Sequence, residues 1–109
     1  MTRYRGTVWW GPAPQKATPS YRPWLVLSTD DHPFAASECI AVAMTTTRHD
    51  AGIIVSDDDW VEGGADSESY VSPWYVATFK YADLDRRQGR VAEDVVRRAA
   101  AELHAYTPE

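Results

Sequence analysis

The sequence predicts a mainly β protein, a small barrel of short strands followed by one C-terminal helix. Within residues 1–80, short apolar runs alternate with connections rich in Gly, Pro and Asp. The runs recur at regular spacing, which favours a barrel over a flat sheet. After residue 90 the composition changes to helix formers with apolar residues at steps of three and four.

Five or six strands are expected, at residues 6–10, 23–29, 39–45, 52–55, 69–73 and 74–79. The run Trp24–Leu27 lacks alternation, so both faces of its strand are expected to be buried. In residues 39–45 large side chains alternate with Cys39, Ala41 and Ala43, and this small face predicts close packing by a neighbour. Pro73 predicts an edge, a bulge or a bend.

A helix is expected over residues 91–106. Its apolar stripe consists of Val91, Val95, Ala99, Leu103 and Tyr106. Acidic residues follow its start, where negative charge suits the helix dipole.

Length and composition indicate one globular domain spanning residues 1–109. The chain has 109 residues, of which 44% are hydrophobic and 25% charged. Cys39 is the single cysteine, which excludes an intramolecular disulfide and favours a reducing compartment. No apolar run approaches the roughly 20 residues that a membrane span needs. We expect a soluble, cytoplasmic protein without membrane contact.

Charge is distributed unevenly along the chain. The formal net charge is −5, yet residues 1–29 contain four basic residues and no acid. Residues 30–69 contain ten acids and a single base, Arg48. A chain polarised in this way can bind an anion at one end. The alternative is that the acidic loops only interact with water.

An arginine and a threonine cluster are predicted to meet at one rim of the barrel. If residues 23–29 and 39–45 pair antiparallel around a connection centred on residue 34, Arg22 lies opposite Thr46, with Thr45 beside it. The Pro-rich loop that carries Lys16 is expected to end at the same rim. Guanidinium and hydroxyl groups over a small pocket can hold a phosphate. Spacing alone favours another interpretation, in which the arginine covers the barrel end and the threonines close a strand.

Five stretches, in this order, resemble the MazF/PemK (Kid) toxin family. They are Gly6 to Trp10, Arg22 to Ser28, Thr45-Thr46, Ser69 with Val71, and Leu84 to Gly89 before the last helix. Many members of that family carry Asp-Gln before this last stretch. Here residues 72–78 differ from that pattern, and Trp74 stands near the position of the family's glutamine.

The resemblance implies an SH3-like barrel that forms a homodimer, to which the small face of residues 39–43 would contribute. It implies a sequence-selective endoribonuclease of a type II toxin-antitoxin system, acting on single-stranded mRNA without metal or other cofactor and restrained by a cognate antitoxin protein. Arg22 and Thr45 match the catalytic arginine and threonine. RNA contacts are expected from Trp10, Lys16, Tyr21, Thr46, Thr47, Arg48 and Trp74.

Other features carry weaker signals. His32 follows two aspartates, which suggests a solvated turn, a metal ligand or an accessory acid or base near the rim. His49 and His104 are expected to be structural or at the surface, and Cys39 to be a core residue. The competing functional class is a catalytically inactive SH3-like barrel that binds protein or nucleic acid.

Overall fold

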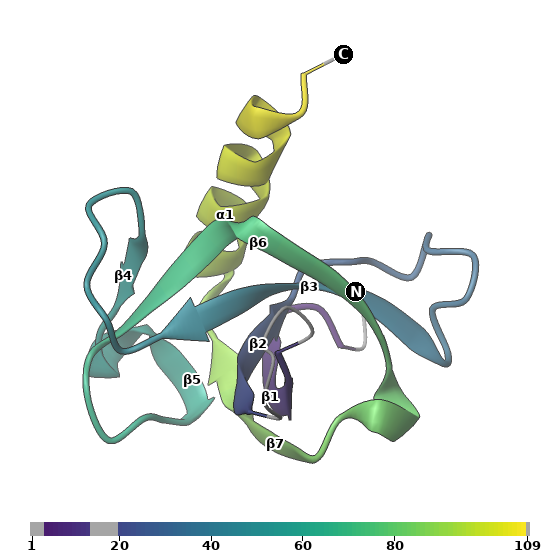
Figure 1. Cartoon of the computed structure of the whole chain (residues 1–109), viewed down its shortest axis with the longest axis horizontal. Coiled ribbons are helices and arrows are strands. Elements are labelled where there is room, and N and C mark those ends of the chain that lie inside the picture. Colours follow the sequence, from purple (N-terminus) through teal and green to yellow (C-terminus); the bar gives the residue numbers. More distant parts are fainter. Residues whose placement is uncertain (1–3, 14–19, 109) are drawn as a thin grey trace.

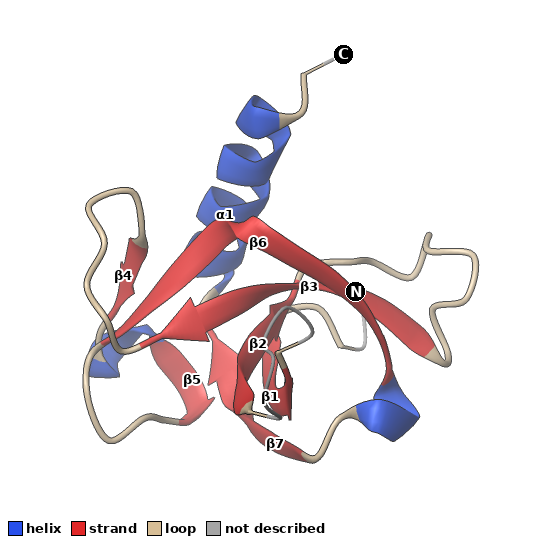
Figure 2. Cartoon of the chain, viewed as in Figure 1, coloured by secondary structure: helices blue, strands red, loops and turns tan. Residues whose placement is uncertain are grey.

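Residues 4–13 and 20–108 are described by the computed structural model. They form one seven-stranded sheet followed by a helix (Figure 1), with two single-turn 3₁₀ helices in the connections (Figure 2). The strands are β1 (Thr7–Pro12), β2 (Tyr21–Val26), β3 (Glu38–Thr45), β4 (Ile53–Val55), β5 (Trp60–Gly63), β6 (Ser69–Lys80) and β7 (Arg86–Val91). The helix is α1 (Glu93–Tyr106), and the 3₁₀ helices span Asp57–Asp59 and Tyr81–Asp83.

The strand order is β4-β6-β3-β2-β1-β7-β5, and every neighbouring pair is antiparallel. The sheet curls into a nearly closed barrel, and the first strand pairs with the last one. The predicted class, a small β-barrel with a C-terminal helix, is confirmed.

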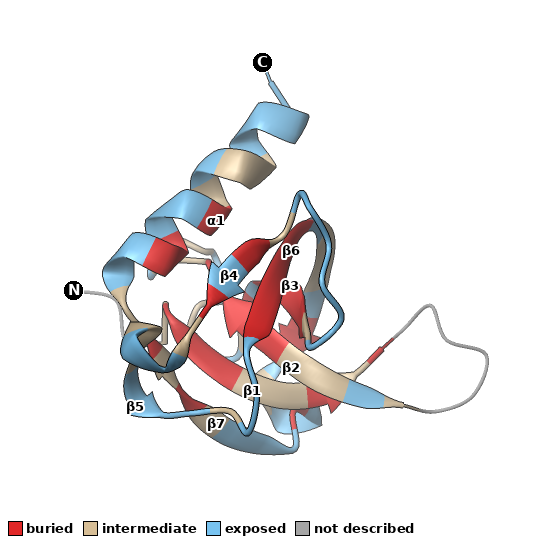
Figure 3. Cartoon of the chain, turned by 90° about the vertical axis from the view of Figure 1, so that its left-hand side faces the viewer, coloured by how far each residue is buried: buried red, intermediate tan, exposed pale blue. Residues whose placement is uncertain are grey.

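Helix α1 packs across β6 and β4. Val95, Val96 and Ala99 are buried on the side of the helix that faces the sheet (Figure 3). They join a main core with the apolar side chains of β3, β4 and β6. No helix in the described part of the chain is long and apolar enough to cross a membrane.

Residues 24–26 of β2 are buried on both faces of the sheet, as predicted. Leu25 belongs to the main core, whereas Trp24 and Val26 belong to a second cluster on the other face of the sheet. Trp24 is fully buried, and its Nε1–H donates to the carbonyl of Gly11 at 3.3 Å. Truncating a buried tryptophan typically costs about 3–5 kcal/mol. Trp24 therefore fixes the strand that follows Arg22.

The alternation in β3 is also confirmed, but its small face has a different role from the one expected. Cys39, Ala41 and Ala43 pack with Trp24 and Phe79 of the same chain. Their small size makes room for these rings. Because these residues already pack within the chain, this face is not available to a second copy, and this argument for a homodimer is wrong. Burial raises the pKa of the Cys39 thiol to about 11, as suits a core cysteine.

Several predicted boundaries are wrong. Strand β1 runs through Gly11 to Pro12, because its pairing with β2 continues there, and β2 spans residues 21–26 instead of 23–29. The segments 69–73 and 74–79 form one strand, β6. The helix starts at Glu93, because Val91 ends β7 and is buried there in the main core.

Pro73 lies in a bulge of β6, which confirms one of the predicted alternatives. Val42 pairs with Val76, whereas its neighbour Ala43 pairs with Ser72. Residues 73–75 therefore have no partner on β3. The ribbon of β6 turns a corner in Figure 1, beside α1. This bulge changes the direction of the strand next to the site described below.

Strands β5 and β7 were not predicted. Strand β5 is only four residues long and β7 is largely polar, and residues 84–89 had been expected to lead directly into the helix. They approach closely where Gly63 faces Gly89. A Cβ added at Gly89 would lie 2.2 Å from the carbonyl oxygen of Glu62. Glycine at this position is therefore what allows the two strands to pair.

Gly89→Ala should destabilise the fold. The added methyl group collides with backbone, which cannot move without breaking the β5–β7 pairing, and overpacking typically costs about 1–3 kcal/mol. Urea unfolding measures the loss. Gly64→Ala is the matched control, because a Cβ at Gly64 has nothing within 4 Å. Equal stability of the two variants would contradict the close approach.

Candidate functional site

A pocket of about 820 Å³ opens at the end of the barrel where β2 begins and β3 ends. Its walls come from β1, β2, β3, β7 and the loop between β5 and β6. The lining residues are Trp10, Ser20, Tyr21, Arg22, Pro23, Met44, Thr45, Thr46, Gly64, Ala65, Asp66, Ser67, Ser69, Arg86, Arg87 and Gln88. The pocket therefore joins segments from both halves of the chain.

Arg22 and Thr45 both line this pocket. Trp24 pairs with Ala43, and continuing this register by two residues places Arg22 level with Thr45. The predicted register, with Thr46 opposite Arg22, is wrong by one residue, because the β2–β3 connection is not symmetric about residue 34. Alternate residues of a strand share a face, so Arg22 and Thr45 extend the face that carries Trp24 and Ala43.

The surroundings of these two side chains leave their donors available. Within the described ranges, no carboxylate lies within ion-pair distance of Arg22, and its Cζ lies 5.2 Å from the centre of the Tyr75 ring. The hydroxyl oxygen of Thr45 accepts the backbone N–H of Thr47 at 3.1 Å. With that oxygen occupied, the hydroxyl hydrogen is free to donate. A guanidinium fork and a neutral donor at one rim suit an anion.

Strand β7 supplies a second basic wall. The Cζ atom of Arg86 lies 5.5 Å from the centre of the Trp10 ring. Arg87 lies next to it and forms a 2.7 Å ion pair with Glu62 on β5. The two arginines therefore differ in electrostatics, since the charge of Arg87 is balanced and Arg86 rests on an aromatic ring.

The loop between β5 and β6 forms the facing wall. Gln88 donates from Nε2 to the carbonyl of Gly64 at 3.0 Å and so holds the loop beside β7. At the other end of the loop, the Tyr70 hydroxyl donates to Glu68 at 2.9 Å, and this bond raises the pKa of Tyr70. The loop brings one carboxylate, Asp66, into the pocket lining.

The sequence prediction missed Arg86, Arg87, Gln88 and the loop. A usable signal was present, because "RRQGR" gathers three basic residues within five positions. The predicted residues that do line the pocket are Trp10, Tyr21, Arg22, Thr45 and Thr46. Tyr21 keeps 56% of its surface exposed, which leaves its ring open to a ligand.

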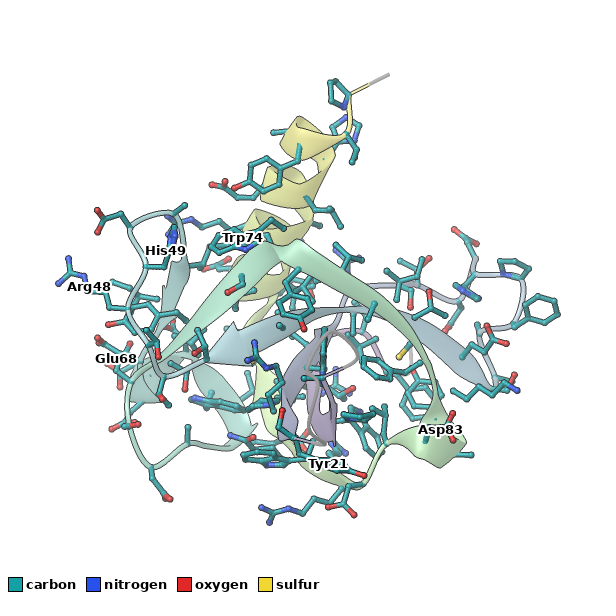
Figure 4. The ribbon with its side chains drawn as sticks, viewed as in Figure 1. Tyr21, Arg48, His49, Glu68, Trp74 and Asp83 are labelled. Atoms are coloured by element: carbon teal, nitrogen blue, oxygen red, sulfur yellow. The ribbon has the colours of Figure 1, made fainter. Side chains whose placement is uncertain are left out.

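Other predicted contacts lie away from the pocket. Thr47 and Arg48 are exposed in the connection after β3 and do not line it. The ring of Trp74 lies 4.9 Å from that of His49, centre to centre. Figure 4 shows these two side chains together near α1, well away from Tyr21. Lys16 lies outside the described residues.

His32 is at the opposite end of the β2–β3 pair from Arg22. It sits in the connection after β2, where its Nδ1 accepts the backbone N–H of Phe34 at 3.0 Å. The prediction that it assists at the rim is therefore wrong. Among the described residues, no three His, Cys, Asp or Glu side chains gather as they would around a metal ion.

These features define a structural class: a curled antiparallel barrel with a cationic pocket at one rim and a C-terminal helix. The sequence model of PemK-like, MazF-like toxins of type II toxin-antitoxin systems matches residues 4–107, and the chain belongs to this family. None of the curated proteins matches the chain.

Solved structures share the fold at low sequence identity. An endoribonuclease in complex with its cognate antitoxin from a mycobacterial species has a TM-score of 0.68 at 19% identity, over 95% of this chain and 94% of that one. A second mycobacterial endoribonuclease has a TM-score of 0.63 at 21% identity, over 96% and 90%. A chain of MazE-MazF from Deinococcus radiodurans has a TM-score of 0.67 at 14% identity, over 97% and 95%.

Glu62→Gln should strengthen the binding of single-stranded DNA, used here as a polyanion probe, to the pocket. The change removes a negative charge beside the pocket and releases Arg87 from its ion pair, and exposed pairs are typically worth about 0.2–1 kcal/mol. We expect about two- to five-fold tighter binding at low salt and a smaller difference at high salt, because salt screens these charges. Fluorescence anisotropy of a labelled oligonucleotide measures the effect.

Glu93→Gln is the matched control for that experiment. Glu93 is as exposed as Glu62, but it pairs with Arg5 and Arg97 at the start of α1. An equal gain in affinity for the two variants would mean that net charge, not the pocket, governs binding.

Proposed function

We propose that this protein is the toxin of a type II toxin-antitoxin system and a sequence-selective endoribonuclease that cleaves single-stranded RNA without a metal ion. The observation that carries the proposal is that Arg22 and Thr45 line one pocket, with no carboxylate within ion-pair distance of the guanidinium among the described residues. Membership of the toxin family supports the same reaction class.

The reaction is a transfer of the phosphoryl group within the RNA. The 2′-oxygen of the nucleotide before the cut attacks the adjacent phosphorus and loses its proton. The bond from phosphorus to the 5′-oxygen breaks, and that oxygen gains a proton. The products are a 2′,3′-cyclic phosphate and a 5′-hydroxyl end. Negative charge grows on the non-bridging oxygens in the transition state, so the enzyme must stabilise it there.

Arg22 and Thr45 are the groups proposed for that stabilisation. The planar fork of an arginine can donate to two phosphate oxygens at once, and a threonine hydroxyl adds a third donor. Pro23 restricts the backbone next to Arg22, and the buried strand β2 anchors it. The donors are thus set before the substrate binds. Arginine hardly loses its proton, so it does not serve as the base.

The remaining walls would bind the flanking nucleotides. Trp10 and Tyr21 offer aromatic faces on which bases can stack. Arg86 can contact a neighbouring phosphate or a base edge. Asp66 can accept hydrogen bonds from base edges, which would give sequence preference.

A cognate antitoxin and a second copy of the chain are the proposed protein partners. The support for the antitoxin is the family and the fold shared with a toxin solved in complex with its own antitoxin. We propose that an acidic segment of the antitoxin occupies the same cationic pocket as RNA, since both would be attracted by Arg22 and Arg86. The homodimer rests on the family alone.

Arg22→Ala should abolish detectable RNA cleavage, and Thr45→Ala should reduce it, while both variants stay folded. Removing one donor to a developing negative charge typically costs about 10²–10³ in rate. Arg22→Lys should recover activity only in part, because an ammonium lacks the planar fork. Single-turnover cleavage of a long RNA measures the rates, with Arg98→Ala, an exposed arginine on α1, as the control. Wild-type rates for Arg22→Ala would refute the assignment.

A 2′-deoxy nucleotide immediately before the cut should stop cleavage at that site, because the nucleophile is then missing. Cleavage should persist in a metal chelator. Sequencing of 5′ ends from a long RNA first identifies the sites, and oligonucleotides with and without the single deoxy substitution then test them. Cleavage of the deoxy substrate would refute the mechanism, and binding of RNA with no cleavage by folded protein would favour the binding-module alternative.

A further inference from the structure

We propose that Tyr75 is a positioning residue whose aromatic ring holds the guanidinium of Arg22 in place for the scissile phosphate. The proposal deepens the proposed function and rests on it. It concerns the stretch of residues 72–78, which departs from the family pattern.

The ring lies beneath the cation. The Cζ atom of Arg22 is 5.2 Å from the ring centre of Tyr75, within the distance of about 6 Å at which an aromatic face attracts a cation. Arg22 itself is half-buried at the rim of the pocket. The contact therefore restricts a long side chain that would otherwise sample many rotamers.

The ring is fixed in turn by the second cluster. Tyr75 meets Trp24 edge to face, with ring centres 5.3 Å apart and planes at 88°. Trp24 is fully buried and packs edge to face on Phe79 at 4.8 Å. A rigid stack of rings thus extends from the core to Arg22, and the guanidinium rests on its outer end.

The bulge in β6 places Tyr75 in this position. Residues 73–75 are extra relative to β3, and regular pairing resumes with Val76 opposite Val42. Without residues 73–75, the side chains of β6 would keep alternating between the two faces of the sheet beside Ala43. The bulge lets one more side chain fill the space beside Trp24, under the rim.

An aromatic platform suits the chemistry better than a carboxylate. A carboxylate would fix Arg22 but would accept its N–H donors and neutralise its charge. The face of a ring attracts the cation and leaves the donors in the guanidinium plane for phosphate oxygens. This agrees with the lack of an ion pair at Arg22 among the described residues.

The hydroxyl group of Tyr75 is not the functional part. Its oxygen is buried without a hydrogen-bond partner among the described residues, and Tyr75 is not part of the pocket lining. A buried hydroxyl with no partner destabilises a fold. Tyr75→Phe should therefore keep cleavage at the wild-type rate and leave the melting temperature equal or higher.

The contact can be tested in the free protein by NMR. Side-chain protons of Arg22 above the ring should be shifted upfield by its ring current, with the signals assigned by their loss in Arg22→Lys. The shift should persist in Tyr75→Phe and disappear in Tyr75→Leu. Unshifted Arg22 signals in the wild-type protein would overturn the proposal, whether or not Tyr75→Leu folds.

Cleavage kinetics test the consequence. In Tyr75→Leu, kcat should fall by about three- to thirty-fold, the factor that corresponds to the usual range of cation–ring interactions. KM for RNA should change by less than about two-fold, because the contact acts on the reacting phosphate and not on the flanking nucleotides. Phe34→Leu is the matched control, an aromatic-to-leucine change on an exposed loop.

The outcomes separate this proposal from the proposed function. Wild-type kcat in a folded Tyr75→Leu variant, or loss of cleavage in Tyr75→Phe, would overturn the role of the ring while cleavage by the wild-type protein stands. A wild-type protein with shifted Arg22 signals that cleaves no RNA would instead remove the proposed function, and with it the catalytic meaning of the contact.

Discussion

The burial of Trp24 is the interaction on which the rest of the structure depends. Its indole ring is fully buried, donates to the carbonyl of Gly11 on β1 and packs against Phe79 on β6. One side chain therefore ties three strands together. The small residues of β3 provide the space, because Ala41 and Ala43 leave room for the indole ring. The pocket lies directly beyond this contact, at the ends of the strands that the contact holds together.

Much of the fold could be predicted, because its central strands are strongly apolar. The run Trp24–Leu27 and the alternation in residues 39–45 locate β2 and β3, although the bounds of β2 differ from the predicted ones. Strands β5 and β7 could not be found in the same way. They lie next to each other at one end of the strand order, and no apolar pattern marks them, because β5 has only four residues and Val91 is the one large apolar residue of β7. Their pairing depends on two facing glycines, which is a property of the assembled sheet.

The functional site could also be predicted only in part from the sequence. Arg22 and Thr45 could be brought together from the antiparallel pairing of two neighbouring segments, with an error of one residue. Trp74 could not be placed, because three bulged residues turn it toward His49. His32 could have been placed correctly, since the predicted pairing around residue 34 already puts its connection at the other end of the strands from Arg22. Arg86 escaped notice because a polar strand was mistaken for a connection.

Because β1 pairs with β7, the order of synthesis determines when the pocket can form. Strand β1 is synthesised before its partner β7 and before the pocket wall that β7 carries. An unfinished chain has Arg22 and Thr45 but neither Arg86 nor a closed barrel. Translation that stops before β7 yields a product without a complete pocket, so any activity built on this pocket requires that β7 has been synthesised and has paired with β1.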